Sequence, residues 1–254
     1  MANNKTMNVA ILGDGLLGNE LGEQSGWDVI SRSANGFDIT DPSTWTTHLL
    51  ENEHGVIFYN KYDVIVNCMA HTDTYSHDKE LHWKVNYEGV ANLVEFCNRH
   101  SIKLVHMSTD YVYSNSTSDA TEEDVPVHCA NWYGYTKLLG ESHVQLRSNN
   151  FLVIRATHKK LPFEHIHAWI TQVGNFDYVD VIATLIIGLV ASDLDGIYNV
   201  GTELKTMYDL AKKSNPDVMP TIDVAHDSTP LNTSMSILKM LQALDLKTFK
   251  SIGI

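Results

Sequence analysis

The chain has 254 residues, 43% of them hydrophobic and 19% charged, which provides enough apolar material for a packed core and excludes an intrinsically disordered protein. The formal net charge of −13 argues against a nucleic-acid or anionic-membrane partner, because binding to phosphate-rich surfaces requires a basic face. The three cysteines, Cys68, Cys97 and Cys129, lack metal-ligand spacing, and their odd number argues against a disulfide scaffold. We find no signal peptide and no apolar run of about 20 residues, so we predict a soluble, cytoplasmic protein.

Short apolar runs alternate with amphipathic stretches over the first 157 residues. The apolar runs predict buried strands over residues 7–12, 28–31, 62–68, 102–108 and 151–155. The amphipathic stretches predict helices over residues 16–24, 42–50 (capped by Asp41 or Thr40), 85–100 and 131–147. Strands separated by helices of this length form βαβ units, so we predict an α/β fold with a Rossmann-type, doubly wound parallel sheet covered on both faces.

The pattern loosens after Thr157. We expect helices over residues 179–191, 206–213 and 234–244 and a short strand over 196–200. No repeat, low-complexity tract or linker interrupts the chain. We therefore predict a Rossmann domain with the catalytic residues over 1–157. Residues 158–254 would add the remaining sheet elements and a small, abbreviated C-terminal substrate lobe, packed with the first part as one unit.

A glycine-rich loop follows the first predicted strand and opens the first predicted helix. It reads G-x-G-x-x-G and consists of Gly13, Asp14, Gly15, Leu16, Leu17 and Gly18. Glycines allow a tight turn and close approach of the backbone to a pyrophosphate, and the helix N-terminus offers free N–H groups to its phosphates. We predict that this loop binds an NAD(P) dinucleotide through every residue except Asp14; a purely structural turn is the alternative.

The end of the second predicted strand bears on the choice between NAD and NADP. An acidic residue there would hydrogen-bond the ribose hydroxyls, whereas this chain offers Ser31, Arg32 and Ser33. Arg32 could pair with a 2′-phosphate and Ser33 could donate a hydrogen bond to it. The sequence thus favours NADP(H), with NAD(H) as the open alternative.

A tyrosine and a lysine lie four residues apart at the start of the long helix predicted over 131–147. The spacing places Tyr133 and Lys137 on one helical face. A neighbouring ammonium lowers the pKa of a phenol, which suits proton donation to a carbonyl near neutrality. The same spacing occurs twice more, at Tyr75/Lys79 and Tyr208/Lys212.

Only the Tyr133 pair lies downstream of a strand that ends in hydroxyl side chains, Ser108-Thr109-Asp110-Tyr111. Ligands of open α/β sheets bind outside the carboxyl ends of the strands. We therefore predict that Thr109, Tyr133 and Lys137 form a catalytic set in which Thr109 hydrogen-bonds a substrate carbonyl. A capping threonine and a surface ion pair are the structural alternatives.

Several segments, taken in order, carry a family resemblance. They are the glycine loop 13–18, residues 38–41 (DITD), 66–72 (VNCMAHT), 85–89 (VNYEG), 108–113 (STDYVY) and 133–137 (YGYTK). Together they resemble the extended short-chain dehydrogenase/reductase superfamily and, within it, the dTDP-4-dehydrorhamnose reductase family. The resemblance covers residues 7–157 and is far more specific than any single motif.

The resemblance implies a reductase that carries hydride from a nicotinamide cofactor to the 4-keto group of a nucleotide-linked deoxysugar. Tyr133 would protonate the developing alkoxide, Lys137 would tune Tyr133 and hold the ribose, and Thr109 would position the carbonyl oxygen. Further cofactor contacts would come from Arg32, Asp38, Ile39, Met69, Ala70 and His71. Substrate contacts would come from Thr72, Thr109, Asp110 and His158, although Asp110 also fits a loop carboxylate bonded to backbone.

The chain departs from the family pattern in three ways. Its glycine loop is one residue shorter than the usual G-x-x-G-x-x-G, and His158 replaces a sugar-stacking aromatic residue. The segment 158–175, which usually helps to form the substrate lobe, is abbreviated.

Two other functions remain open. One is a nucleotide-sugar epimerase; a dehydratase is disfavoured because Tyr111, and not glutamate, follows Asp110. The other is a non-catalytic NADP-binding regulatory subunit resembling the methionine adenosyltransferase β subunit. We predict no metal site, since neither His165/His167 nor His77/His82 has a third ligand at useful spacing. The resemblance leaves a homodimer open.

Overall fold

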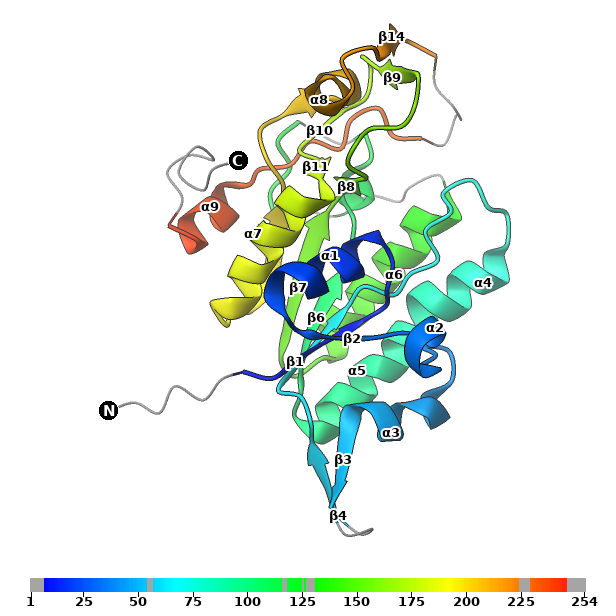
Figure 1. The fold of residues 1–254 in the computed structure, drawn as a ribbon, viewed down its shortest axis with the longest axis vertical. Coiled ribbons are helices and arrows are strands. Elements are labelled where there is room, and N and C mark those ends of the chain that lie inside the picture. The colour runs from blue at the N-terminus through cyan, green and yellow to red at the C-terminus, as the bar shows by residue number, and fades with distance from the viewer. Residues whose placement is uncertain are drawn as a thin grey trace.

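The computed structural model describes residues 7–53, 57–115, 118–124, 126, 131–223 and 229–245. Cys129 and the N-terminal residues 1–6, on which the signal-peptide expectation rests, lie outside this set. A parallel sheet of six strands in the order β12-β7-β6-β5-β1-β2 forms its centre (Figure 1). The strands are β1 (Val9–Leu12), β2 (Asp28–Ile30), β5 (Val64–Asn67), β6 (Lys103–Met107), β7 (Phe151–Ala156) and β12 (Gly196–Val200). The predicted α/β, doubly wound fold is confirmed.

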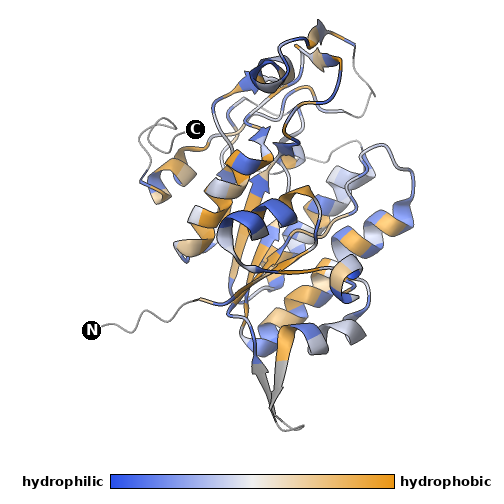
Figure 2. Cartoon of the chain, in the orientation of Figure 1, coloured by the Kyte–Doolittle hydropathy of each residue, from blue (hydrophilic) through white to orange (hydrophobic). Residues whose placement is uncertain are grey.

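Helices cover both faces of this sheet, which explains why its strands are largely apolar (Figure 2). In β1, Val9 and Ile11 face one core and Ala10 and Leu12 face the other. The first core is completed by α1 (Leu16–Ser25), α7 (Val179–Ala191) and α9 (Leu238–Ala243). The second is completed by α3 (Trp45–Leu49), α5 (Gly89–His100) and α6 (Trp132–Arg147).

The helix predicted over 85–100 begins earlier than expected. It starts at α4 (Lys79–Trp83), where the Asp78 side chain accepts a hydrogen bond from the Leu81 N–H at 3.0 Å, and runs through a π-helical turn, η2 (Lys84–Glu88), into α5. The sequence pattern misses α4 because its inward-facing residue, His82, is polar although fully buried. The buried face is real, but it is not apolar.

The helix predicted over 42–50 is divided. Asp41 caps a short 3-10 turn, η1 (Pro42–Thr44), which leads into α3. From Leu50 the chain turns into an antiparallel hairpin of β3 (Leu50–Glu53) and β4 (Ile57–Asn60) that lies outside the central sheet. A further short helix, α2 (Arg32–Asn35), follows β2 and is capped by the Ser31 side chain.

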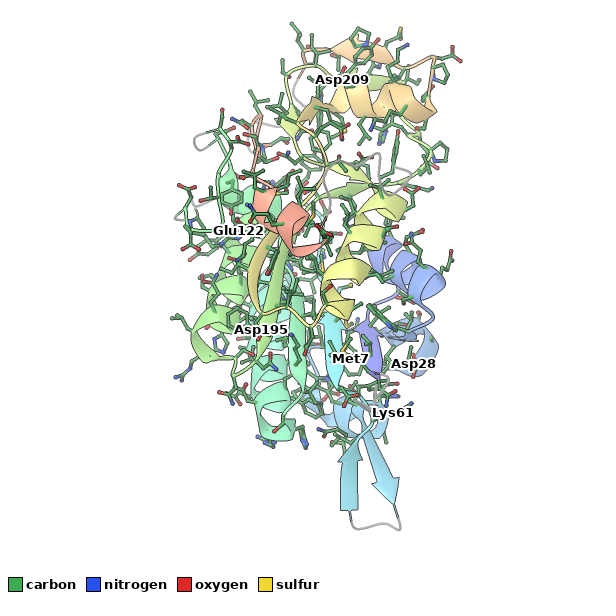
Figure 3. The ribbon with its side chains drawn as sticks, turned by 90° about the vertical axis from the view of Figure 1, so that its left-hand side faces the viewer. Met7, Asp28, Lys61, Glu122, Asp195 and Asp209 are labelled. Carbon is green, nitrogen blue, oxygen red and sulfur yellow. The ribbon has the colours of Figure 1, made fainter. Side chains whose placement is uncertain are left out.

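A small lobe lies beyond the carboxyl ends of the central strands. In Figure 3, Met7 and Lys61 mark the amino-end side of β1 and β5, and Asp209 on α8 (Met207–Ser214) marks the lobe at the opposite end. The lobe has its own apolar cluster, built around Phe176 and Leu210. It also holds the paired short strands β8 (His158–Lys159), β9 (His167–Trp169), β10 (Val173–Gly174), β11 (Asp177–Tyr178), β13 (Lys205–Thr206) and β14 (Met219–Thr221).

The helix predicted over 234–244 is shorter than expected, because the chain before α9 runs extended. Met235 forms a parallel bridge with Ala120, and the Thr233 N–H donates to the Val173 carbonyl at 3.1 Å. Within the described part of the chain, no helix is both long enough and apolar enough to cross a membrane.

Candidate active site

A cleft of about 600 Å³ opens at the carboxyl ends of β1, β5, β6 and β7. The chain leaves β1 towards β2 on one side and β5 lies on the other, so this is the point at which the strand order reverses. Open parallel sheets bind ligands at such a switch point. The predicted site residues that line the cleft are Gly13, Gly15, Leu16, Leu17, Gly18, Arg32, Asp38, Ile39, Met69, Ala70, Thr72, Thr109, Tyr133, Lys137 and His158.

The glycine loop is shaped by close contacts of its own backbone. Gly13 has φ +103°, and a Cβ on Gly18 would lie 1.9 Å from the Gly13 carbonyl oxygen. A Cβ on Gly15, in contrast, would meet only open space. Gly15 is the N-cap of α1 and offers no side-chain acceptor to the first-turn N–H groups. These N–H groups and the positive end of the helix dipole suit the diphosphate of a dinucleotide, so the loop fits this cofactor.

At the end of the cleft next to β2, two carboxylates lie beside Arg32 and Ser33, the groups expected to bind a 2′-phosphate. Arg32 forms an ion pair with Asp38, and the Ser33 hydroxyl donates to Asp14. Hydrogen bonds from Ser33 and Ser31 lower the pKa of Asp14. Burial raises the pKa of Asp38, but hydrogen bonds from Thr40 and the Arg32 charge outweigh it and leave the pKa lowered. Both carboxylates are therefore charged at neutral pH.

The segment after β5 lines the cleft with all of residues 68–72 except His71. The backbone of His71 is held by Asn86, whose Oδ1 accepts the His71 N–H at 2.8 Å, and its ring packs on His82 with 4.4 Å between centroids. The structure thus keeps the His71 side chain with the helices and away from the cleft wall.

Tyr133 and Lys137 lie together in the cleft wall on the first turns of α6. This helix starts where it does because the Asn131 side chain accepts the Gly134 N–H at 2.8 Å. The Tyr133 ring meets the Tyr111 ring edge to face, with 5.7 Å between centroids. Neither of the other two Tyr/Lys pairs at this spacing contributes to the cleft wall.

The Lys137 ammonium is buried and donates to the carbonyl of Met107, the last residue of β6. Burial lowers the pKa of Lys137 to about 8, although the nearby Cys68 and Glu141 act in the opposite direction. The Cys68 thiol is itself kept neutral, because burial raises its pKa to about 12. Lys137 is therefore charged at neutral pH and close to its titration point.

Behind Lys137, a buried ion pair joins α6 to the sheet. Glu141 lies one helical turn after Lys137, and its Oε1 is 2.6 Å from Nη2 of Arg155 on β7. The other carboxylate oxygen accepts a hydrogen bond from Ser108 at the end of β6. Both charged side chains are fully buried. The pair therefore fixes the position of α6 relative to the ends of β6 and β7 that form the cleft.

Thr109 and Asp110 have different places at the end of β6. Thr109 lines the cleft, and its hydroxyl oxygen accepts the Tyr111 N–H at 3.2 Å as the cap of the 3-10 turn η3 (Asp110–Tyr113). Asp110 is buried outside the cleft wall, and its carboxylate accepts hydrogen bonds from Thr157 and from Thr233 at 2.6 Å. Burial raises the pKa of Asp110 despite these bonds. Its contacts anchor the extended segment before α9.

Several cleft residues had no predicted role. All except Val85, which lies in η2, follow strand ends or lie near them, and this is the signal that could have found them: Asp14, Cys68, Thr74, Met107, Ser108, Tyr111, Ala156, Thr157 and Lys159. The described residues contain no group of three or more His, Cys, Asp or Glu side chains that could hold a metal ion.

A parallel sheet with a glycine loop at its switch point, and a tyrosine and lysine on the facing helix, defines a Rossmann-type protein with a short-chain dehydrogenase/reductase-like site. Residues 7–158 match the family model of the RmlD substrate binding domain, and the chain belongs to this family. The resemblance found in the sequence is confirmed.

Curated relatives carry the name dTDP-4-dehydrorhamnose reductase. The protein from Mycolicibacterium smegmatis is 30% identical over 177 residues, which cover 67% of this chain and 47% of that protein. The protein from Mycobacterium tuberculosis is 29% identical over 187 residues, which cover 68% of this chain and 54% of that protein. The chain thus spans about half the length of these relatives.

Solved structures share the fold over nearly the whole chain. A hypothetical dTDP-4-dehydrorhamnose reductase from Sulfolobus tokodaii is 25% identical, with a TM-score of 0.77 and coverage of 96% of both chains. The Bacillus anthracis reductase in complex with NADP has a TM-score of 0.76 at 22% identity, covering 95% and 94%. Bordetella bronchiseptica WbmG in complex with NAD and UDP has 0.72 at 16% identity, covering 98% and 91%.

Proposed function

We propose that the protein is an NAD(P)H-dependent reductase of a 4-keto, nucleotide-linked deoxysugar, similar to dTDP-4-dehydrorhamnose reductase. The observation that carries this proposal is the meeting of Thr109, Tyr133 and Lys137 with the glycine loop in one cleft. The names of the curated relatives support the substrate class. Neighbours bound to NADP or to NAD support a nicotinamide cofactor.

In this function the cofactor supplies the hydride. Tyr133 donates a proton to the oxygen of the reduced carbonyl, and Lys137 stabilises the phenolate that remains and binds the ribose hydroxyls. The Tyr111 N–H donates to the Thr109 hydroxyl oxygen and holds it in place. The hydroxyl proton, which points to Asp110 in the structure, rotates freely and donates to the substrate oxygen. Residues of the glycine loop hold the diphosphate through backbone N–H groups.

Consumption of NADPH or NADH, followed by absorbance, tests the proposal with 4-keto sugars linked to dTDP, UDP or GDP. We expect reduction of at least one of them by the protein without a partner. Tight cofactor binding without turnover on the whole panel would contradict a reductase and favour the regulatory-subunit alternative. Isomerisation of the sugar without net cofactor consumption would favour the epimerase alternative.

The rate of this reaction should fall at alkaline pH. Lys137 acts as an ammonium, and because burial lowers its pKa to about 8, it loses its proton well below the value of about 10.4 for an exposed lysine. The charged form is present below pH 8 and is lost as the pH rises through this value. We expect kcat/KM to decrease above about pH 8. A profile that stays level to pH 10 would contradict the role of Lys137.

The preference for NADPH expected from Arg32 should be modest. A 2′-phosphate would share Arg32 with Asp38 and would lie near the Asp14 carboxylate. Arg32 is also exposed, where an ion pair contributes about 1 kcal/mol or less. We expect Arg32→Ala to raise the Kd of NADPH about fivefold and that of NADH less than about twofold, as measured by fluorescence titration. Arg99→Ala, at the far end of α5, serves as the control. Equal effects on both cofactors would remove the basis for an NADPH preference.

A further inference from the structure

Three cations line the cleft, and they differ in what they contact. Arg32 is paired with Asp38, and Lys137 donates to the Met107 carbonyl. The third, Lys159, is half-buried on β8. Within the described ranges, the Lys159 ammonium has no hydrogen bond and no ion pair. Lys159 is therefore the cleft cation without an acceptor of its own.

The carboxylate whose charge acts on Lys159 is that of Asp110, and this carboxylate already has other hydrogen-bond partners. The Asp110 carboxylate accepts hydrogen bonds from the hydroxyls of Thr157, Thr233 and Thr109. Burial lowers the pKa of Lys159, and the charge of Asp110 offsets this only in part. A half-buried ammonium without a hydrogen-bonded partner is costly, and an anionic ligand would remove this cost.

The position of Lys159 separates it from the predicted diphosphate site of the cofactor. That site is the N-terminus of α1, after β1, whereas Lys159 follows β7 and is held by the pairing of β8 with β11 at the start of the lobe. Lys159 pairs in register with Tyr178, next to the buried Asp177–Lys205 ion pair. Its backbone is thus fixed on the lobe side of the cleft.

We propose that Lys159 binds the diphosphate of the nucleotide-linked substrate. This assignment rests on the proposed function, because it requires a second anionic ligand beside the dinucleotide. The net charge of −13 disfavours binding of a second diphosphate, and the Lys159 ammonium in the cleft offsets this repulsion locally. The diphosphate does not react, so Lys159 binds it equally well in the ground state and in the transition state of the reduction. Its loss therefore acts on affinity and not on the chemical step.

The adjacent lysine provides a matched control. Lys160 is exposed, contributes nothing to the cleft wall and forms an ion pair with Glu164 at 2.6 Å. The variants Lys159→Met and Lys160→Met each remove one charge from neighbouring positions while keeping an unbranched side chain. Lys159→Arg restores the charge at the first position. Thermal unfolding and NADPH titration show whether each variant is folded and retains its cofactor site.

Binding of UDP and of dTDP to the NADPH-saturated protein is measured by calorimetry. We expect Lys159→Met to raise the Kd of the nucleoside diphosphate about tenfold and to reduce its salt dependence, with the Kd of NADPH changed less than about twofold. Lys160→Met should change neither, and Lys159→Arg should recover most of the affinity. Where a keto sugar is reduced, Lys159→Met should raise KM and leave kcat nearly unchanged.

Two outcomes would overturn the assignment: no binding of either nucleotide by the parent protein, or equal effects of Lys159→Met and Lys160→Met. Nucleotide binding is measured without turnover, so the two proposals fail separately. Lys159-dependent binding of UDP or dTDP without reduction of any keto sugar would contradict the reductase alone. Reduction with an unchanged KM in Lys159→Met would contradict the role of Lys159 alone.

Discussion

Replacing Tyr133 by phenylalanine should lower kcat by about 10²–10⁴-fold, the range that a positioned general acid contributes. The substitution removes only the phenolic oxygen, so the ring contact with Tyr111 and the start of α6 are kept. The Kd of the cofactor should change by less than about twofold, because we expect the loop backbone and the first turn of α1 to provide most of its contacts. Turnover and fluorescence titration are measured on the same preparation.

Tyr135 offers the matched control for this experiment. It lies two residues further along α6, packs edge to face on Trp132 at 5.7 Å and is not part of the cleft wall. Tyr135→Phe should therefore retain nearly full activity. Loss of cofactor binding in Tyr133→Phe, with normal turnover per bound cofactor, would refute the role of Tyr133 as proton donor.

Replacing Glu141 by alanine should lower the free energy of unfolding by about 3–5 kcal/mol, as expected when one partner of a buried ion pair is removed. Arg155 would remain fully buried with its charge uncompensated, and Ser108 would lose its acceptor. Urea unfolding measures the change. Glu95→Ala, on the exposed face of α5, should stay within about 0.5 kcal/mol of the parent protein.

The variant Glu141→Ala also tests how the ion pair affects the pH dependence of the reaction. Glu141 raises the pKa of Lys137, so its removal should move the alkaline limb of the rate profile below pH 8. Replacing both Glu141 and Arg155 by apolar residues of similar size should recover part of the stability, because no buried charge is then left unpaired. A double variant as unstable as Glu141→Ala would show that the loss comes from the packing of α6 and not from the uncompensated charge.

The sheet could be predicted from sequence because the hydrophobic residues of each strand segment by themselves indicate that it is buried. Strands that are covered on both faces must be largely apolar, as in β1, whose four residues are all hydrophobic and buried. Helix α7 spans Val179–Ala191 as predicted, since its apolar residues reach the core at every turn. Helix α4 escaped prediction because its buried residue His82 is polar and breaks the apolar pattern.

The lobe could not be predicted in the same way. Its strands have two or three residues, which is too short for a periodic pattern, and each exists only through pairing with a remote segment, such as Met219–Thr221 with His167–Trp169. The hairpin of β3 and β4 has the same origin: its register is set by the opposite strand.

For the candidate site, the sequence alone determined which segments carry it. The glycine loop, the hydroxyl-rich end of β6 and the Tyr133/Lys137 pair follow from local spacing, because helix and strand periods place residues of one segment on one face. Only the tertiary structure decided which neighbour in a segment enters the cleft: Thr72 and not His71, Lys159 and not Lys160. It also decided that Asp14 and Asp38 engage the groups expected to bind a 2′-phosphate. The physical reason is that the direction and the partners of a side chain depend on segments far away in the chain, whose approach no local pattern encodes.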